Sequence, residues 1–336
     1  MPFHEPESPE GPFIELESLE KTFTVRRRTG PFRRERCEVR AVDGISFRVE
    51  RGEMVGYIGP NGAGKSTTIK MLTGILTPTG GRLRVAGIDP ARERTRLAQR
   101  IGVVFGQRTT LWWDLPLKDS YRLMHRMYRI PDARYRENLA RCVELLELGE
   151  LLDVPVRQLS LGQRMRGDIA AALLHDPEVL YLDEPTIGLD VVSKSRVREF
   201  LRDLNDTRNT TVLLTTHDLT DIEQLCSRVM VIDHGRLMYD GALAGLHAVG
   251  ESERLLVVDL EREAPPIEDV PGARFVRAEG PRQWLAFPAT ASAAPLVAAV
   301  AARHPLIDLS VREPDIEAVI AKMYGGTRED RRESLR

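Results

Sequence analysis

The feature that most constrains this 336-residue chain is a glycine-rich loop, Gly59-Pro-Asn-Gly-Ala-Gly-Lys-Ser66. An apolar segment at residues 53–58 precedes the loop and predicts a strand, while residues 67–76 after it predict a helix. The spacing fits G-x-x-x-x-G-K-[ST], in which glycines let backbone N–H groups turn toward phosphate and the helix adds its positive dipole end. A chance glycine loop would lack this context, so we expect a nucleotide phosphate site.

The residues of this loop have distinct expected tasks. Lys65 is expected to reach the β- and γ-phosphates of the nucleotide, and the Ser66 hydroxyl is expected to bind Mg²⁺. The other loop residues expected to contact the nucleotide are Gly59, Pro60, Asn61, Gly62, Ala63, Gly64 and Thr67. Because kinases, GTPases, helicases and transporters share such a loop, it does not identify the reaction by itself.

A second apolar segment, Val179-Leu-Tyr-Leu-Asp-Glu-Pro185, ends in two adjacent acids. Asp183 is expected to hold Mg²⁺ through a coordinated water, and Glu184 to polarise the attacking water as general base. A kinase must protect the γ-phosphate from water, so a second acid beside the magnesium acid favours hydrolysis. The alternative, an acidic cap on a strand before a turn, is disfavoured by the phosphate loop upstream.

Strand and helix predictions alternate over the first part of the chain. Residues 13–19 predict a half-buried strand, and an arginine-rich stretch at 26–36 predicts the tip of an extended hairpin. A solvated tip is favoured there over a membrane or phosphate contact. Residues 111–152 predict mostly helix, and 179–182 and 211–214 predict short buried strands, each after a helical segment. This alternation predicts an α/β fold with a mostly parallel sheet.

The pattern changes after about Gly245. Strands are predicted at 254–261, 273–279, 283–289 and 306–313, and helices at 292–304 and 315–324. These elements predict a small α+β domain, joined to the rest by a linker at 241–253. The expected organisation is a disordered tail at 1–12, an ATPase domain at 13–243, an accessory α+β domain at 244–325 and a flexible tail at 326–336.

Composition excludes several classes of protein. The net charge of -2 argues against a nucleic-acid partner. Three widely spaced cysteines argue against a zinc site or a disulfide-rich fold. The polar, proline-rich start lacks the features of a signal peptide, and the apolar run at 296–302 is too short to span a bilayer. We therefore expect a cytoplasmic chain that contacts membranes only through a partner.

The order of the motifs points to a family. After the phosphate loop come Gln107, Leu-Ser-Leu-Gly-Gln at 159–163, the acidic strand end, Ile-Gly-Leu-Asp at 187–190 and Thr-Thr-His-Asp at 215–218. From residue 13 to about 243, this order resembles the ATPase subunit of an ATP-binding cassette (ABC) transporter. The resemblance implies a P-loop NTPase fold with a RecA-like core, an antiparallel β subdomain and a helical signature subdomain. It also implies an enzyme that couples ATP hydrolysis to transport.

The resemblance assigns roles to individual residues. Phe23 resembles the aromatic residue that stacks on adenine, although an ordinary strand residue is the alternative. Gln107 resembles the glutamine that touches Mg²⁺ and water and senses the membrane partner. Asp190 resembles the acid that communicates across a dimer, and His217 the histidine that hydrogen-bonds the γ-phosphate.

The signature motif departs from the usual LSGGQ, since Leu161 stands at the first glycine position. Ser160 and Gly162 are retained and are implied to contact the γ-phosphate, with Gln163 beside them. We expect less backbone freedom at Leu161 but a working site. In this family the signature of one subunit completes the phosphate site of another, so the resemblance implies a homodimer in the ATP-bound state.

Several segments resemble the ATPase subunits of ABC-2-type exporters, related to daunorubicin- and viologen-type efflux ATPases. They are the arginine-rich insertion, the run Leu-Trp-Trp-Asp-Leu-Pro at 111–116, the signature and the C-terminal helix. Separately encoded permeases are the implied partners, which places the chain on the inner face of the cell membrane. Trp112 and Trp113 suit a contact with such a partner, and core packing is the alternative.

Other functions were weighed against this one. DNA-repair ATPases carry long coiled coils between the two motifs, but only 95 positions separate Lys65 from Ser160, without sustained heptads. Ribosome-associated relatives need two cassettes in one chain, and this chain has one. The remaining alternative is a regulatory or sequestering nucleotide binder that does not act in transport. Glu184 and His217 argue against it, and Leu161 leaves it open.

Overall fold

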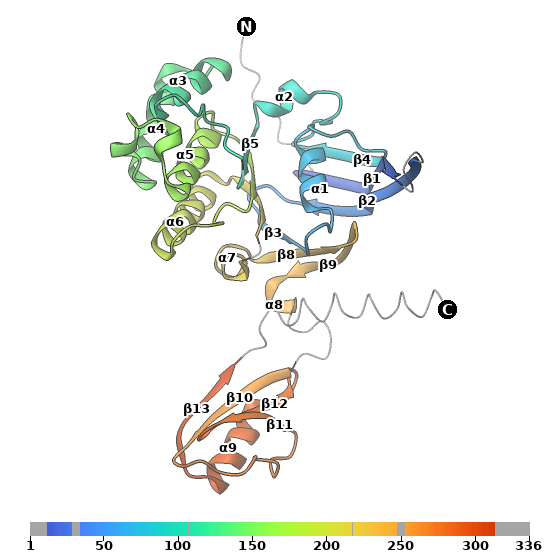
Figure 1. The fold of residues 1–336 in the computed structure, drawn as a ribbon, viewed down its shortest axis with the longest axis vertical. Coiled ribbons are helices and arrows are strands. Elements are labelled where there is room, and N and C mark those ends of the chain that lie inside the picture. Colours follow the sequence, from blue (N-terminus) through green and yellow to red (C-terminus); the bar gives the residue numbers. More distant parts are fainter. Residues whose placement is uncertain (1–11, 29–33, 107, 217, 247–252, 313–336) are drawn as a thin grey trace. The chain divides into compact units, whose positions relative to one another are not determined.

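The computed structural model describes residues 12–28, 34–106, 108–216, 218–246 and 253–312 (Figure 1). The chain divides into two compact units, Met1–Asp240 and Gly241–Arg336. Each unit contains its own cluster of buried apolar side chains. The larger unit holds a parallel sheet, an antiparallel sheet and a group of helices.

The centre of the larger unit is a six-stranded sheet in the order β5-β6-β7-β3-β8-β9. The pairings of β5 with β6, β6 with β7, β7 with β3 and β3 with β8 are all parallel. Every residue of β3 and β7 is buried, which explains their nearly continuous apolar sequences. The strands predicted at 53–58, 179–182 and 211–214 are therefore confirmed. The six strands are β5 (Ile101–Phe105), β6 (Val179–Asp183), β7 (Thr211–Thr215), β3 (Met54–Ile58), β8 (Arg228–Asp233) and β9 (Arg236–Ala242).

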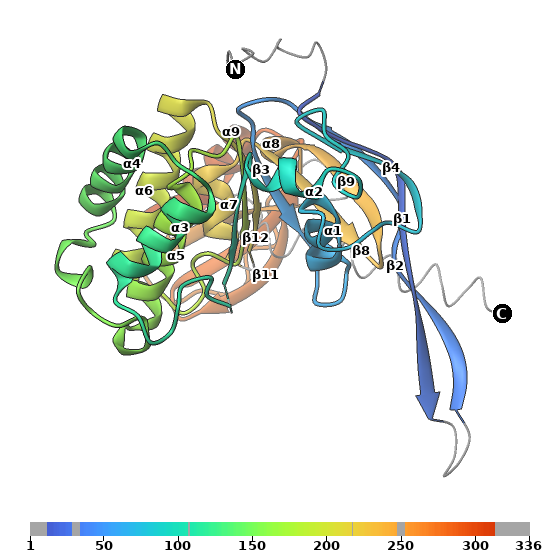
Figure 2. The same cartoon turned by 90° about the horizontal axis from the view of Figure 1, so that it is seen from above.

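Helices surround this sheet, and three of them gather away from the antiparallel strands in both views (Figures 1 and 2). These three are α3 (Leu117–Met127), α4 (Asp132–Leu145) and α5 (Leu161–Leu173). Two short 3-10 helices, η1 (Gly149–Leu151) and η2 (Val156–Gln158), lie between α4 and α5 in the chain. The prediction of mostly helix at 111–152 is confirmed, with a break where Arg129 adopts φ 53° shortly before Pro131 caps α4. The remaining helices of this unit are α1 (Lys65–Leu72), α2 (Arg94–Ala98), α6 (Val191–Arg208) and α7 (Leu219–Leu225).

Helix α1 begins and ends earlier than its sequence pattern predicts. It begins at Lys65 because Gly64, at φ 107°, turns the phosphate loop directly into the helix. It ends after Leu72 because Gly74 adopts φ 71°, with its N–H donating to the Met71 carbonyl at 3.0 Å. A left-handed glycine that closes the last turn in this way is a common helix end.

The second sheet of this unit is antiparallel, in the order β2-β1-β4. Its strands are β2 (Arg34–Val49), β1 (Ile14–Arg28) and β4 (Gly80–Val85). Beyond the part that pairs with β4, β1 and β2 continue as a long two-stranded ribbon (Figure 2). The predicted hairpin is thus confirmed up to the pair Arg28 and Arg34, while residues 29–33 of its tip lie outside the described residues.

The smaller unit contains a four-stranded antiparallel sheet in the order β11-β12-β10-β13. Alternate residues of the sheet, such as Leu256, Val258 and Phe287, share a core with Leu296 and Val300 of the helix. The predicted strands and the helix at 292–304 are confirmed, and the helix predicted at 315–324 lies outside the described residues. The elements are β11 (Arg274–Glu279), β12 (Arg282–Pro288), β10 (Glu253–Leu260), β13 (Leu306–Arg312) and α9 (Ala293–Arg303).

The linker expected at 241–253 is partly wrong. Its first residues complete β9, and α8 (Leu243–Leu246) follows directly. β10 begins at Glu253, so 247–252 is the only part of the expected linker that the structure leaves undescribed. Among the residues described, no helix has both the length and the apolar character needed to cross a membrane.

Candidate nucleotide site

The glycine loop is held tightly between strands of both sheets. A Cβ on Gly59 would lie 2.3 Å from the carbonyl oxygen of Ile232 at the end of β8. A Cβ on Gly64 would lie 2.4 Å from the carbonyl oxygen of Ala41 in β2. The loop is also fixed from outside, since the Gly235 N–H donates to the Ala63 carbonyl at 2.9 Å. Glycine is therefore required at both ends of the loop by packing as well as by its task toward phosphate.

Lys65 is buried at the start of α1, and its ammonium group lies inside the loop. Its Nζ donates to the carbonyl oxygens of Gly59 and, at 3.2 Å, of Pro60. Burial lowers the pKa of Lys65, and the carboxylates of Glu184 and Asp183 oppose that change. The acids at the end of β6 are thus close enough to act electrostatically on the lysine of the loop.

Ser66 and Asp183 meet beside this lysine. The Ser66 hydroxyl donates to Oδ2 of Asp183 at 3.4 Å, and the Thr215 hydroxyl donates to Oδ1 at 2.5 Å. Thr215 ends β7, the neighbour of β6, and was not predicted as a site residue. One carboxylate and one hydroxyl at the mouth of a phosphate loop fit Mg²⁺, which binds few protein oxygens and completes its shell with phosphate and water.

Glu184 follows Asp183 in a backbone conformation that is rare for its residue type. Its φ is 59°, and its N–H donates to the Thr215 carbonyl at 2.8 Å. Non-glycine residues with positive φ are concentrated at functional sites, where surrounding contacts hold them in place. Glu184 follows the end of β6, and its carboxylate is close enough to Lys65 to act on it electrostatically.

Gly106, which the sequence analysis did not single out, packs directly on the two acids. Its N–H donates to the Asp183 carbonyl at 2.6 Å, and a Cβ there would lie 2.4 Å from the Glu184 carbonyl oxygen. Gln107 follows it in sequence and lies outside the described residues. The backbone next to Gln107 is nevertheless fixed against the acids that this residue is expected to assist.

A buried acid of the signature helix holds the segment after Gln107. Asp168 in α5 accepts hydrogen bonds from the Thr109 hydroxyl at 2.9 Å, the Thr110 N–H at 2.9 Å and the Thr110 hydroxyl at 3.1 Å. Burial raises the pKa of Asp168, and these hydrogen bonds oppose the change. Asp168 was not predicted as a site residue, although an acid among the apolar positions of α5 was an available signal.

The signature motif begins α5 with a capping box. The Ser160 hydroxyl accepts from the Gln163 N–H at 3.2 Å, and the Gln163 side chain accepts from the Ser160 N–H at 2.9 Å. The Ser160 hydroxyl keeps its proton for another acceptor, and its side chain is exposed. Gln163, in contrast, uses its side-chain oxygen within its own helix end. Gly162 is half-buried next to them.

Two further predicted site residues have clear positions. Phe23 is half-buried in β1 opposite Val39, with the Lys21 ammonium 5.2 Å from the ring centre. Its stacking on adenine stays a prediction.

Asp190 caps α6, accepting from the Ser193 N–H at 2.9 Å and the Ser193 hydroxyl at 2.6 Å. The hydrogen bond from the Ser193 side chain lowers the pKa of Asp190, so this exposed acid is ionised at neutral pH.

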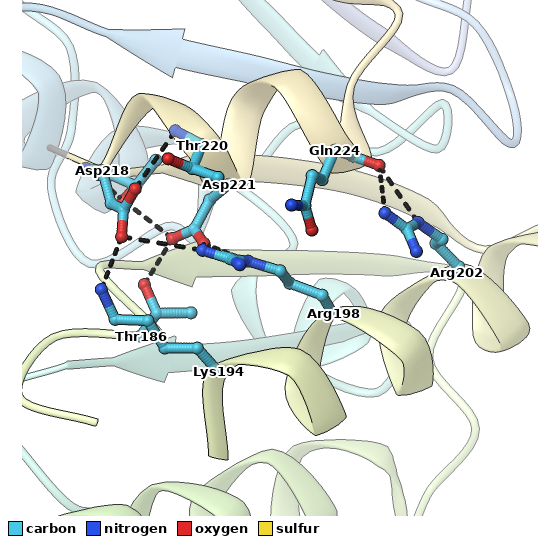
Figure 3. A network of polar contacts seen from close by, with 9 residues as sticks. Thr186, Lys194, Arg198, Arg202, Asp218, Thr220, Asp221 and Gln224 are labelled. Atoms are coloured by element: carbon cyan, nitrogen blue, oxygen red, sulfur yellow. Dashed lines mark hydrogen bonds and ion pairs between the residues drawn. The ribbon is translucent and has the colours of Figure 1, made fainter. Parts of the chain in front are cut away.

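A buried polar network supports the segments around Glu184 and His217 (Figure 3). Its centre is Asp221 of α7, which is 0% exposed. Asp221 accepts from the hydroxyls of Thr186 and, at 3.2 Å, Thr216, and it pairs with the guanidinium of Arg198 in α6 at 2.5 Å. Thr186 stands two residues after Glu184, so one carboxylate holds both segments.

Asp218 extends this network toward the start of α7. Its carboxylate accepts from the Thr220 N–H at 3.1 Å and from the Lys194 ammonium at 2.5 Å, and its own N–H donates to the Thr216 hydroxyl at 3.0 Å. Burial favours a higher pKa for Asp218, but the hydrogen bond and charge of Lys194 outweigh it and lower the pKa. His217 lies outside the described residues, and both of its neighbours are anchored.

Comparisons with known proteins agree with this geometry. A family profile described as ABC transporter matches residues 42–187. The daunorubicin/doxorubicin resistance ATP-binding protein DrrA of Streptomyces peucetius is 38% identical over 262 residues, which cover 73% of this chain and 78% of DrrA. The chain belongs to the ABC transporter ATP-binding family. The Nod factor export ATP-binding protein I of Ralstonia nicotianae is also similar, with 38% identity over 235 residues and 70% of each protein covered.

A solved structure confirms the same fold. It is a dimeric post-hydrolysis state of an ATP-binding cassette bound to ADP and Pi, with a TM-score of 0.59 and 26% identity. The similarity covers 68% of this chain and 98% of that chain. The predicted resemblance, the P-loop NTPase fold with its helical subdomain and the assignment as an ATPase of transport are therefore confirmed. As an ABC ATPase domain, the larger unit binds ATP.

The packing of Gly106 predicts a selective loss of chemistry in Gly106→Ala. Its new Cβ would displace the Glu184 backbone, and a shift of about 1 Å can lower a rate by roughly 10²-fold. Steady-state ATP hydrolysis is the measurement. Gly149→Ala is the matched control, because a Cβ on Gly149 meets no atom within 4 Å. Equal rates for the two variants would contradict the assigned role of Gly106.

The buried network predicts that Arg198→Ala destabilises the larger unit. Removing the guanidinium leaves the Asp221 carboxylate buried without its charge partner, which costs about 3–5 kcal/mol in free energy of unfolding. Denaturant unfolding is the measurement. Arg202→Ala is the control, since Arg202 is exposed on the same helix and, within the described part of the chain, donates only to the Gln224 carbonyl, a loss of about 1 kcal/mol. Similar losses in both variants would show that the Asp221 pairing contributes nothing special.

Proposed function

We propose that this protein is the ATP-hydrolysing subunit of an ABC-2-type exporter and that ATP drives two copies of the chain together. The main support for this proposal is the set of side chains in the nucleotide site. The parallel strands β3 and β6 bring the ammonium of Lys65, the hydroxyl of Ser66 and the carboxylates of Asp183 and Glu184 into one site. This set can hold a nucleotide triphosphate and activate water, which a purely regulatory nucleotide binder does not need.

Binding begins at the phosphate loop. Backbone N–H groups from the loop and the start of α1 surround the β- and γ-phosphates, and Lys65 adds a positive charge. Its present acceptors, the carbonyls of Gly59 and Pro60, keep the ammonium inside the loop before phosphate arrives. Phe23 is assigned to the adenine ring and lies where β1 pairs with β2 beyond the end of β4. Burial lowers the pKa of Lys65, and the negative charge of the bound phosphates raises it again.

Hydrolysis is assigned to the acids that follow β6. Ser66, Asp183 through water and Gln107 would hold Mg²⁺, which would supply positive charge beside the phosphates. Glu184 accepts a proton from the attacking water, and the hydrogen bond from its N–H to the Thr215 carbonyl helps to hold its backbone at φ 59°. His217 and Gln107 are assigned to the γ-phosphate and to the attacking water. Thr215 orients Asp183 through its hydroxyl.

The second copy supplies the other side of the γ-phosphate. Ser160 is exposed at the N-terminus of α5 and keeps its hydroxyl proton available, as a group that donates to phosphate must. Gly162 adds a backbone N–H donor in the same turn, with Gln163 holding the turn in shape. Asp190, ionised and exposed at the start of α6, is assigned to contacts between the copies. The similar cassette that was solved as a dimer supports this arrangement.

The helical subdomain is assigned to the permease, a separately encoded membrane protein. Trp112 and Trp113 are 37% and 50% exposed, which favours a partner contact over core packing. Nearby, α3 and α4 form a groove of about 790 Å³, lined by Leu115 and Leu123 and by the arginines Arg122, Arg126 and Arg136. A cytoplasmic segment of the permease fits this mixed surface. The chain would then lie on the inner face of the cell membrane.

The direction of transport follows from relatives. The similar proteins include one named for daunorubicin and doxorubicin resistance and one named for Nod factor export. Efflux of a drug, lipid or other small molecule is therefore the proposed process, with the substrate selected by the permease. We assign the nucleotide chemistry to residues 13–243 and an accessory role to residues 244–325.

The proposal predicts that Glu184→Gln binds ATP but does not turn it over. Loss of a general base lowers kcat by about 10²–10⁴-fold, while the phosphate loop and its ATP affinity stay intact. Steady-state hydrolysis and equilibrium ATP binding are the measurements. Glu223→Gln, which changes an exposed acid of α7, serves as control and keeps the normal rate. Normal turnover in Glu184→Gln would refute the general-base assignment, and a wild-type protein that binds but never hydrolyses ATP would favour the regulatory alternative.

A further inference from the structure

The unusual leucine of the signature motif lies against the segment that follows Glu184. Leu161 is the first residue of α5 and is 38% exposed. Its Cδ2 atom lies 2.4 Å from the position that a Cβ on Gly188 would occupy. A side chain at Gly188 would therefore overlap Leu161. The leucine at one position and the glycine at the other are sterically complementary.

The contact continues along both segments. A Cβ on Gly162 would lie 3.3 Å from Cδ2 of Leu189 and 3.7 Å from Oγ of Ser193. Ser193 is the residue that donates to the Asp190 carboxylate. The signature turn thus rests on the loop at 187–190 and on the first turn of α6. These are the two segments through which a second copy of the chain would act.

The loop from Glu184 to Asp190 is consequently held at two points. Thr186 is fixed by the buried Asp221 on one side, and Gly188 is covered by Leu161 on the other. Gly188 itself adopts φ 69°, a conformation that carries little cost only for glycine. A glycine at position 161 would remove the contact over Gly188, while Leu189 would still lie against Gly162.

We propose that Leu161 is a positioning residue that couples the signature turn to the Glu184–Asp190 loop by packing over Gly188. The inference rests on the proposed function, because it concerns how contact between Ser160 and the ATP of the other copy changes the position of Glu184, the general base in the same chain as Ser160. When the γ-phosphate of the partner's site draws in Ser160, Leu161 carries the displacement to Gly188. The leucine that replaces the first glycine of LSGGQ then supports catalysis through its contact with Gly188.

A double-mutant cycle tests this pair. Gly188→Ala alone overlaps Leu161 and lowers kcat by roughly tenfold or more beyond the cost of its own backbone strain, since contacting residues are strongly coupled. In the Leu161→Gly background the overlap is absent, so Gly188→Ala costs only the strain. Gly87→Ala measures that strain separately, because Gly87 has φ 75° and open space around it. KM for ATP is expected to stay within a few-fold throughout.

Two readouts separate a positioning role from packing alone. The cycle is measured in kcat and in the ATP-dependent dimerisation of the four proteins, and Tm is recorded without nucleotide. Non-additivity in kcat and dimerisation supports the proposal. Additive effects, or non-additivity confined to Tm, overturn it. If Gly188→Ala fails to fold with Leu161 present, the cycle is measured between Leu161→Ala and Leu161→Gly, and additive effects on kcat and dimerisation there overturn the proposal.

The proposed function is tested independently by the same proteins. Hydrolysis by the wild type is measured first, and its absence would refute the ATPase assignment. The dimerisation cycle does not depend on hydrolysis, so additive effects on dimerisation would still overturn the Leu161–Gly188 coupling in that case.

Discussion

The parallel pairing of β5, β6, β7 and β3 is the constraint on which the nucleotide site depends. Carboxyl ends of parallel strands meet at one edge of a sheet, so each strand delivers its following residues to the same place. β3 delivers the phosphate loop, β6 the two acids, β5 Gly106 and β7 Thr215. Hydrogen bonds between these ends, such as Gly106 N–H to the Asp183 carbonyl, fix the site before any ligand arrives.

Two contacts outside the sheet then hold the segments that must move together. The buried Asp221 binds both Thr186 and Thr216, and its charge is balanced by Arg198 of α6. On the opposite side, Asp168 of α5 binds the segment after Gln107. The signature helix α5 and α7 therefore each hold one of the loops around the acids. A displacement of either helix is transmitted to the site through buried hydrogen bonds, which tolerate little distortion.

Much of this site could be predicted from sequence because its residues stand in short local motifs. The phosphate loop, the acid pair after β6 and the buried strands are each specified within ten or so residues. Gly106, Asp168, Arg198 and Asp221 could not be found in this way, because their partners are far away in sequence and only the fold brings them together. Helix α1 ends early because of Gly74. The apolar periodicity continues past this glycine and therefore predicted a helix that ends too late. Gln107 and His217 remain predictions from the resemblance.

The most direct test of the account is the mass in solution of Glu184→Gln with and without ATP and Mg²⁺. One copy of the chain has a mass of 37.8 kDa. We expect this mass without nucleotide and twice this mass with ATP and Mg²⁺, because each exposed Ser160 turn completes the phosphate site of the other copy. A protein that binds ATP yet keeps the mass of one copy would contradict closure of two copies around the nucleotide.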